Sequence, residues 1–367
     1  MKSRRLSLLI LMLFSLLLTM TIAELGFRLF LPETFLLNWH SEDYWKARLV
    51  AKINKDNNKN PSDEIEKNIL YNSIYDSNLG WRMMPLYKSE GIKHNSKGFR
   101  GKKEYNSQPT KKRIFAVGDS YTYGLGVSDE YTFSSLLNDM SDVEVINAGV
   151  NGYGVDQAYL MWELEGKKLN PSIVILGYYL NDFYRSSYIV RGKPKPHFDY
   201  DKGGEDFVLK GVPVPDNQTL LDRGELQVDS GFRLFRVFAW IKQGVNKRFV
   251  SSKELDSNSY ERLIPKAKLN EYILKKFNDS VTRSGARLLV VFMGAHARCY
   301  EPSLEAQWVE HSIIETCQEN NIEYINLAEI MRQDGYYSSF YAQHCHFTES
   351  GHRFTAKKIA EKLGLSN

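Results

Sequence analysis

The sequence predicts an α/β protein with a parallel β-sheet, a transmembrane helix at the amino terminus and one long insertion. From Arg113 onward, short apolar runs rich in Val and Ile alternate with helical patterns. This alternation is typical of a parallel sheet that helices cover on both faces. The first thirty residues contain an uncharged, Leu-rich stretch, and a long segment without the alternation follows the third apolar run.

The alternation predicts five strands and five helices. The expected strands are Arg113 to Val117, Val143 to Asn147, Ser172 to Leu176, Arg287 to Phe292 and Glu323 to Asn326. The expected helices are Thr132 to Asn138, Asp156 to Gly166, Ala267 to Ser284, Ser303 to Asn320 and Glu349 to Leu363. Ligands of such sheets bind at the carboxyl ends of the strands, near the point where strand order reverses. We therefore look for a functional site in the loops after the first three strands.

Composition excludes several classes of protein. The 367 residues include 48 Lys and Arg against 44 Asp and Glu, so the net charge is only +4. A nucleic-acid-binding protein usually has a larger basic excess. A hydrophobic fraction of 43% with 25% charged residues indicates a folded globular protein and excludes a collagen-like or disordered chain. Cys299, Cys317 and Cys345 are widely spaced without a CxxC pair, which supports neither a disulfide framework nor a zinc site, and at most one disulfide can form.

The amino terminus predicts a membrane anchor. Three of the first five residues are basic, and the uncharged stretch from Leu6 to Ala23 is long enough to cross a bilayer. The positive-inside rule then places the amino terminus in the cytoplasm and the rest of the chain outside it. A cleaved signal peptide is the main alternative, because Thr21 and Ala23 fit the small-residue positions of a cleavage site. A buried core helix is disfavoured because no polar stripe interrupts the run.

Three domains are expected: a signal-anchor over residues 1–30, a stalk and lead-in over 31–110 and a main domain over 111–367. The polar, aperiodic stretch from Lys52 to Asn68 is interpreted as a solvated loop or linker. Two turn-rich pieces of the lead-in, residues 76–82 and 95–100, each contain an aromatic residue and are expected to pack onto the main domain.

The insertion covers residues 184 to about 265. It is expected to contain a hairpin about Gly203 and Gly204 and an apolar-periodic segment from Phe232 to Ile241. Because it follows the third strand, it overhangs the edge where ligands bind. It is interpreted as a structural cap or, alternatively, as a lid or part of an acceptor groove.

The first expected strand leads into Gly118-Asp119-Ser120, which places a serine hydroxyl at the mouth of the sheet. Gly118 permits a tight turn at this point. The segment is not the G-x-S-x-G elbow of α/β-hydrolases, because Thr122 occupies the place of the second glycine. Taken alone, Asp and Ser here equally fit an ordinary turn or a helix N-cap.

The loops after the second and third expected strands provide hydrogen-bond donors at the same edge. Gly152 lies in the small-residue loop 147–154, where backbone N–H groups can approach a ligand closely. Asn181 lies in the loop after the third strand and offers a side-chain amide. Together they are candidates for an oxyanion hole, in which the loss of one donor typically costs about 2.7–4 kcal/mol. Each loop alone is also compatible with a plain turn.

A histidine cluster precedes the last expected helix. His344, His346 and His352 fall within ten residues of one another. A serine nucleophile needs a base, and histidine is the usual base near neutral pH. Any single one of these histidines is equally compatible with a packed or solvent-facing role.

The four segments resemble, in order and spacing, the SGNH or GDSL-type hydrolases, over about Arg113 to Leu363. This resemblance implies a flavodoxin-like three-layer α/β/α fold with a five-stranded parallel sheet. It also implies a serine nucleophile at Ser120 and a base at His346. The oxyanion hole is then formed by the backbone N–H groups of Ser120 and Gly152 and by the Asn181 side chain, with Asp119 supporting the nucleophile. The anchor, the lead-in pieces and the insertion resemble those of uncharacterised membrane-anchored bacterial members.

One position departs from the family pattern. The family normally carries an Asp two or three residues before the catalytic His, and this sequence has His344 and Gln343 there. The carboxylate orients the imidazole and stabilises its cation, and amide replacement in a serine protease costs about 10⁴-fold in rate. Three possibilities follow: a slow Ser120–His346 dyad aided by the Gln343 carbonyl, a carboxylate from elsewhere such as Asp334, or lost catalysis.

The function expected is that of an extracytoplasmic serine esterase in the bacterial inner membrane, with its catalytic domain in the periplasm. It would remove acyl groups, most simply O-acetyl, from an envelope or exported polysaccharide through an acyl-serine intermediate. The alternatives are an O-acyltransferase of the same fold acting on a glycan, and a catalytically silent glycan-binding or assembly protein. The expected partners are an acylated glycan or other ester and the membrane, without nucleic acid. No cofactor or metal is implied.

Overall fold

The computed structural model describes residues 2–31, 37, 42–57, 72–201, 203–204, 206–227, 233–234, 236–237, 257–294, 303–334, 337–342 and 345–365. The chain divides into two compact units. One comprises Met1–Ser62 and Asp216–Lys253, and the other comprises Asp63–Pro215 and Glu254–Asn367. The second unit contains the sheet and every residue expected at the functional site. The domain boundaries expected at residues 30 and 110 stay a prediction.

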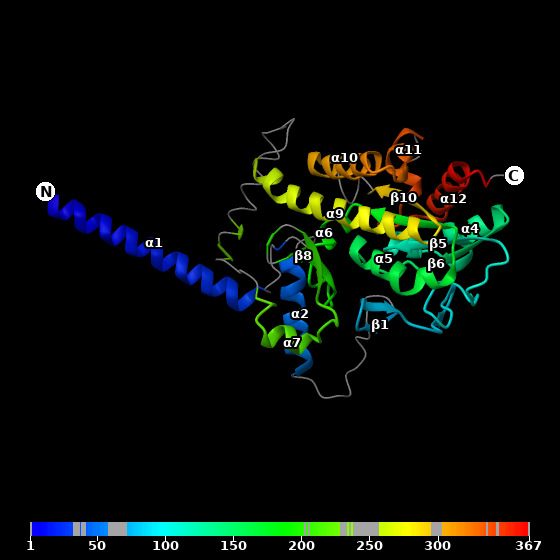
Figure 1. Cartoon of the computed structure of the whole chain (residues 1–367). Helices are drawn as coiled ribbons and strands as arrows, with labels where there is room; N and C mark the ends of the chain where they lie inside the picture. The colour runs from blue at the N-terminus through cyan, green and yellow to red at the C-terminus, as the bar shows by residue number, and fades with distance from the viewer. Residues whose placement is uncertain are drawn as a thin grey trace. The chain divides into compact units, whose positions relative to one another are not determined.

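A five-stranded parallel sheet forms the core of the second unit (Figure 1). Its strands are β5 (Lys112–Gly118), β6 (Val143–Asn147), β7 (Ile173–Tyr179), β10 (Arg287–Gly294) and β11 (Glu323–Asn326). They are ordered β11-β10-β7-β5-β6, so β5 lies between β6 and β7, where the strand order reverses. Four strands are buried along nearly their whole length because helices cover both faces of the sheet, whereas the edge strand β11 is only half-buried. This is the flavodoxin-like order, and the predicted fold class is confirmed.

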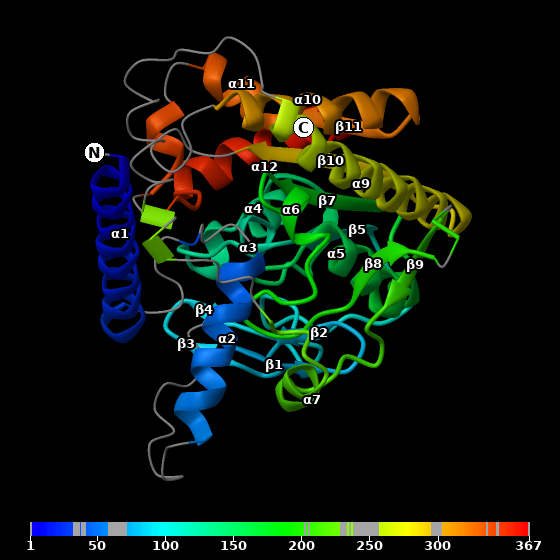
Figure 2. The same ribbon diagram turned by 90° about the vertical axis from the view of Figure 1, so that its left-hand side faces the viewer.

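Two groups of helices cover the sheet. In one group α4 packs against α12 and α11 packs against β10, while in the other α9 packs against both α5 and α10. Figure 2 shows α9 crossing the second unit beneath α10. The helices are α3 (Ser120–Tyr123), α4 (Phe133–Met140), α5 (Val155–Met161), α6 (Asp182–Arg185), α9 (Ser257–Arg283), α10 (Leu304–Glu319), α11 (Leu327–Gln333) and α12 (Glu349–Leu363). A π-helical turn, Trp162–Gly166, extends α5 as the sequence pattern predicted.

Helix α9 differs from the prediction at its start. It begins at Ser257 and not at Ala267, and Pro265 lies inside it. Proline normally ends or kinks a helix at a cost of about 3 kcal/mol or more, because it lacks the amide donor. Here the turns before Pro265 are held by packing: Leu263 is fully buried, and the Tyr260 ring lies 6.3 Å from the ring of Trp308 on α10.

The lead-in packs on the sheet domain. It forms two small antiparallel sheets, one from β1 (Ser73–Asp76) and β2 (Gly80–Met83) and one from β3 (Lys88–Ser89) and β4 (Ile92–Lys93). The Trp81 ring lies 5.6 Å from the ring of Tyr153, and the Phe99 ring lies 5.9 Å from that of Phe115 on β5. Both turn-rich pieces therefore contribute a buried aromatic residue to the core of this unit.

The insertion contains the expected hairpin. Strands β8 (His197–Tyr200) and β9 (Phe207–Lys210) pair antiparallel on either side of the turn at 203–204. A buried ion pair fixes its base: the Lys195 ammonium donates to the Asp156 carboxylate of α5 and, at 3.1 Å, to the carbonyl of Tyr188. Because neither charged group is exposed, removing one partner would leave a buried charge without compensation.

The other unit contains α1 (Lys2–Phe30), α2 (Glu42–Asn57) and α7 (Asn217–Asp222). Within α1, Ile10–Phe30 has a mean hydropathy of 2.0 and is long and apolar enough to cross a membrane. The Arg233 guanidinium donates to the carbonyls of Phe27 and Leu31 at the end of this helix. Of the apolar-periodic segment expected from Phe232 to Ile241, only residues 233–234 and 236–237 lie within the described residues.

The interpretation of Lys52 to Asn68 as a loop is wrong for its first part. Residues 52–57 form the last turns of α2, and residues 58–68 lie outside the described residues. No glycine or proline occurs before Pro61. Trp45 and Leu49, one helical turn apart, are both buried, so packing of the first turns supports a helix that continues into the polar stretch.

Candidate active site

Ser120 stands at the carboxyl end of β5, at the first position of α3. Gly118 has φ +151°, and a Cβ atom there would lie 2.4 Å from the carbonyl oxygen of Gly177. Asp119 caps the helix, because its Oδ1 accepts the N–H of Tyr121 at 2.9 Å. The turn therefore admits no side chain at position 118, and it presents Ser120 at the edge of the sheet with 7% of its surface exposed.

His346 lies against the Ser120 hydroxyl. The distance between His346 Nε2 and Ser120 Oγ is 2.9 Å, across 226 residues of sequence. A short turn just before α12 supports the histidine. The Ala342 N–H donates to the His346 carbonyl at 2.9 Å, and Tyr341 and Phe347 form an isolated antiparallel β-bridge. The structure thus brings together the two side chains that the sequence assigned as nucleophile and base.

The two expected oxyanion loops flank this pair. Gly152 follows β6 and has φ +83°, and Asn181 follows β7 and directly precedes α6. Because β6 and β7 are the two neighbours of β5, their loops emerge beside Ser120 at the same edge of the sheet. The Trp81 indole N–H donates to the carbonyl of Asn151 at 3.0 Å, so the lead-in fixes the backbone next to Gly152.

A buried layer of charge lies behind the nucleophile. The Arg185 guanidinium donates to Asp119 Oδ2 at 3.0 Å and to Asp182 Oδ1 at 2.9 Å. Burial and then the neighbouring charge of Asp119 raise the pKa of Asp182 well above its usual range. Burial alone would lower the pKa of Arg185, but its two carboxylate partners raise it. Arg185 therefore stays charged and holds the Asp119 carboxylate, whose Oδ2 is 3.4 Å from Ser120 Oγ.

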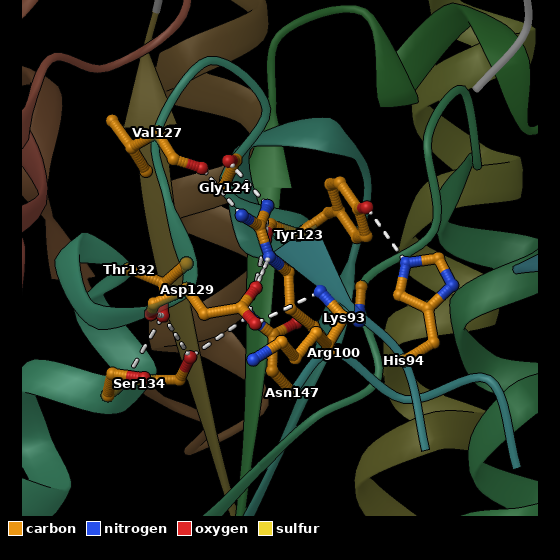
Figure 3. A network of polar contacts seen from close by, with 12 residues as sticks. Lys93, His94, Arg100, Tyr123, Gly124, Val127, Asp129, Thr132, Ser134 and Asn147 are labelled. Atoms are coloured by element: carbon orange, nitrogen blue, oxygen red, sulfur yellow. Dashed lines mark hydrogen bonds and ion pairs between the residues drawn. The ribbon is translucent and has the colours of Figure 1, made fainter. Parts of the chain in front are cut away.

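The loop after the nucleophile helix is held by a second arginine, Arg100 of the lead-in (Figure 3). Its guanidinium donates to the carbonyls of Gly124 and Val127, at 2.7 Å and 2.5 Å, and to Asp129 Oδ1 at 2.8 Å. It also lies 4.5 Å from the centre of the Tyr123 ring. The loop that follows the helix of Ser120 is thus held by a side chain of the lead-in, which precedes the alternating strands and helices.

The expected partners of the imidazole are only partly described. Gln343 and His344 lie outside the described residues, so the role assigned to Gln343 stays a prediction. Asp334, the nearest Asp upstream of His346, is exposed at the end of α11. Cys345, next to His346, is disulfide-bonded, whereas Cys317 is free and buried. Cys299 lies outside the described residues.

Within the described part of the chain, no three His, Cys, Asp or Glu side chains are grouped as metal ligands would be. Asp199 in the insertion pairs with Lys210 at 2.7 Å. Burial lowers the pKa of the neighbouring His197 to about 4.

A sequence profile of the GDSL-like Lipase/Acylhydrolase family matches residues 116–354, which include Ser120, Gly152, Asn181 and His346. The chain belongs to this family. The resemblance of residues 113–363 to GDSL-type hydrolases is therefore confirmed. The protein is accordingly a hydrolase of the GDSL family, whose members act on ester bonds.

Several solved structures are similar to this chain at low sequence identity. A lipase/acylhydrolase from Enterococcus faecalis is 14% identical, with a TM-score of 0.41, and the match covers 69% of this chain and 95% of that one. A lipolytic G-D-S-L protein from Veillonella parvula is 14% identical, with a TM-score of 0.38, covering 68% and 96%. A catalytic mutant of an acetylxylan esterase from Geobacillus stearothermophilus is 11% identical, with a TM-score of 0.39, covering 71% and 97%. No curated protein matches the chain.

Sequence reasoning missed three residues of this GDSL site: Tyr121, Arg185 and Arg100. Tyr121 follows the nucleophile directly and packs against His346, at a ring distance of 5.2 Å. The sequence could have indicated Arg185, because it lies three residues after Asp182 and side chains at this spacing can form an ion pair within one helical turn. Arg100 donates mainly to backbone carbonyls, which leave no trace in a sequence.

Proposed function

We propose that the protein is an extracytoplasmic serine esterase that removes acyl groups, chiefly O-acetyl, from an envelope or exported polysaccharide. The observation that carries this proposal is the 2.9 Å contact between Ser120 Oγ and His346 Nε2. Membership of the GDSL family supports an ester as the bond that is cleaved. The choice of a glycan rests on the location outside the cytoplasm that the apolar helix α1 supports.

In the first half of the reaction, His346 Nε2 accepts the Ser120 proton as Oγ attacks the carbonyl carbon of the ester. The negative charge that develops on the carbonyl oxygen would be held by the N–H groups of Ser120 and Gly152 and by the Asn181 amide. When the tetrahedral intermediate collapses, the sugar oxygen leaves and takes the proton from His346. The product is an acyl-Ser120 ester and a free sugar hydroxyl.

In the second half, water replaces the sugar. His346 removes a proton from the water, which attacks the acyl carbon, and the same donors hold the second oxyanion. Collapse returns the proton to Ser120 Oγ and releases the carboxylic acid. A glycan hydroxyl in place of water would give transfer, so the access of water decides between an esterase and an O-acyltransferase.

The rate should be modest. The family's usual carboxylate is replaced by Gln343 and His344, and a serine protease that loses the corresponding charge slows by about 10⁴-fold. A Gln343 carbonyl could accept the Nδ1–H of His346, but it would supply no negative charge to the imidazolium.

The proposed location is the periplasmic side of the bacterial inner membrane, with α1 as a single-pass anchor. The basic residues before the apolar stretch favour a cytoplasmic amino terminus. The exposed leucines of α1, such as Leu11 and Leu16, support contact with lipid or with the translocation machinery. Retention of the anchor is detected by the intact mass of the protein isolated from membranes.

The test of the proposal is acetate release from O-acetylated oligosaccharides by the full-length protein and by Ser120→Ala. We expect slow release by the wild type and a further fall of about 10²-fold in the variant, because losing the serine costs about 10⁶-fold in a complete triad and the missing carboxylate already accounts for about 10⁴-fold of it. Unacetylated oligosaccharides added to the same reaction distinguish transfer from hydrolysis, since only transfer acetylates the acceptor. Equal release by wild type and variant would overturn the assignment of Ser120. No release from any ester by the wild type would favour the silent binding protein.

A further inference from the structure

The side chain that follows the nucleophile contacts the proposed base. Tyr121 is 2% exposed, and its ring centre lies 5.2 Å from that of His346 with an angle of 34° between the planes. The same ring stacks on Tyr179 at 4.4 Å and 23°, and it meets the edge of Phe347 at 4.9 Å. The imidazole of His346 therefore rests on an aromatic group that is itself held by two others.

The hydroxyl of Tyr121 makes a second connection, to the turn that carries His346. It donates a hydrogen bond to the carbonyl of Cys345. Cys345 has φ +71°, in the left-handed region that a non-glycine residue adopts only when its surroundings impose it. Its N–H donates to the Ala342 carbonyl at 2.9 Å. Tyr121 thus ties the helix of the nucleophile to the turn of the base.

The contacts of Tyr121 could replace part of the role of the carboxylate that this sequence lacks before His346. The usual carboxylate orients the imidazole and stabilises its cation. An aromatic ring in contact with the imidazole restricts its rotation, and a ring within about 6 Å attracts a cation through its π face. In the motif from which the GDSL family takes its name, the residue after the serine is Leu, which offers neither a hydroxyl nor a π face. This chain has Tyr121 in that place.

We propose that Tyr121 is the positioning residue for His346, holding the imidazole toward Ser120 and stabilising its protonated form in the transition state. The proposal rests on the proposed function, because it assigns Tyr121 a role in the same Ser120–His346 pair. It concerns a group that acts through the base and not one that touches the ester.

Two ionisable groups lie near the Ser120–His346 pair, His352 and Asp119. His352 on α12 interacts electrostatically with His346, and burial lowers the pKa of His352 to about 3, so it stays neutral near pH 7. Asp119 lies behind Ser120 and is paired with Arg185. An effect of Tyr121 on the titration of His346 is therefore separable from these groups, which the variants leave unchanged.

The experiment compares Tyr121→Phe and Tyr121→Leu in the full-length protein. Hydrolysis of p-nitrophenyl acetate gives kcat and KM, and the rate of labelling by a fluorophosphonate probe reports the nucleophile independently of a natural substrate. Tyr121→Phe keeps the ring and loses the tether, and we expect kcat to fall about 2- to 12-fold, the worth of one hydrogen bond. Tyr121→Leu loses both the ring and the tether, so its kcat should fall further, by about 10- to 100-fold. KM should change little in either.

A pH profile adds a readout that a purely structural role would not move. In Tyr121→Leu the apparent pKa of the base, taken from kcat/KM, should fall by about half a unit, because the cation loses its contact with the π face. Tyr121→Phe should keep the wild-type value. The matched control is Tyr123→Phe, on the same helix. The hydroxyl that it removes forms a hydrogen bond with His94 at 2.9 Å and not with the turn that carries His346. Its kcat should stay within about two-fold of the wild type.

The outcomes separate the inference from the proposed function. If the wild type neither hydrolyses the ester nor reacts with the probe, the proposed function fails. If Ser120→Ala is inactive but Tyr121→Leu retains the wild-type kcat and pH profile, the inference fails and the proposed function stands. Should Tyr121→Leu not fold, Tyr121→Phe decides alone: a reduced kcat with an unchanged KM supports the inference, and a wild-type kcat overturns it.

Discussion

The nucleophile rests on one buried cation, Arg185. The Asp119 carboxylate that caps the helix of Ser120 is itself fully buried, and so is Asp182. Two carboxylates so close together and away from water are unfavourable unless a cation lies between them. Arg185 contacts both. The position of Ser120 therefore depends on a buried charge behind the site.

We expect Arg185→Met to lower the free energy of unfolding by about 3–5 kcal/mol at pH 7, because it removes the cation that partners the buried Asp119 and Asp182 side chains. The measurement is urea denaturation. The control is Arg332→Met, which breaks an exposed ion pair with Glu310 and should cost no more than about 1 kcal/mol. A loss in Arg185→Met as small as that of the control would show that the buried layer contributes no stability.

At the scale of elements, His352 joins the last helix to α4. Its Nδ1 accepts the N–H of Phe133 at 3.3 Å, and its side chain is buried. This contact satisfies an amide at the start of α4, which is one of the groups that a helix leaves without an internal partner. Since Nδ1 must be unprotonated to accept, the packing of α12 on α4 favours neutral His352.

This packing predicts a pH dependence of stability. The pKa of His352 is lowered from 6.5 to about 3, by burial first and then by Arg100 and His346. The unfolded chain therefore binds the proton more readily, and stability falls as pH drops below about 6.5, by about 2 kcal/mol between pH 7 and pH 5. His352→Gln keeps an acceptor but cannot titrate. Denaturation of both proteins at pH 7 and pH 5 should show that the variant loses about 2 kcal/mol less stability than the wild type. Equal losses of stability would refute the assignment of this pH dependence to His352.

Most strands were predictable because they are apolar runs buried on both faces, and the structure reproduces β6 and the half-buried edge strand β11 residue for residue. The start of α9 was not, because packing of Leu263 outweighs the local signal of Pro265. The candidate site divides in the same way. Ser120 and His346 could be found from motif and spacing, whereas the contacts of Arg100 with backbone carbonyls depend on tertiary structure.

At the scale of the whole chain, the proposed chemistry depends on segments that are far apart in sequence meeting at one edge of the sheet. Ser120 follows β5, Gly152 and Asn181 follow the two strands beside it, and His346 precedes the final helix. The lead-in then fixes two of these loops, through Arg100 and Trp81. The functional site is accordingly a property of the second compact unit as a whole.

Covalent labelling by a fluorophosphonate probe, followed by mass spectrometry of the peptides, tests this convergence most directly. We predict a single adduct on Ser120 in the full-length wild-type protein, no adduct in Ser120→Ala, and labelling slowed by at least about 10²-fold in His346→Ala, the usual contribution of a general base. Failure of the wild type to react at any accessible pH, or labelling of Ser120 at an undiminished rate in His346→Ala, would contradict the pairing of these two side chains.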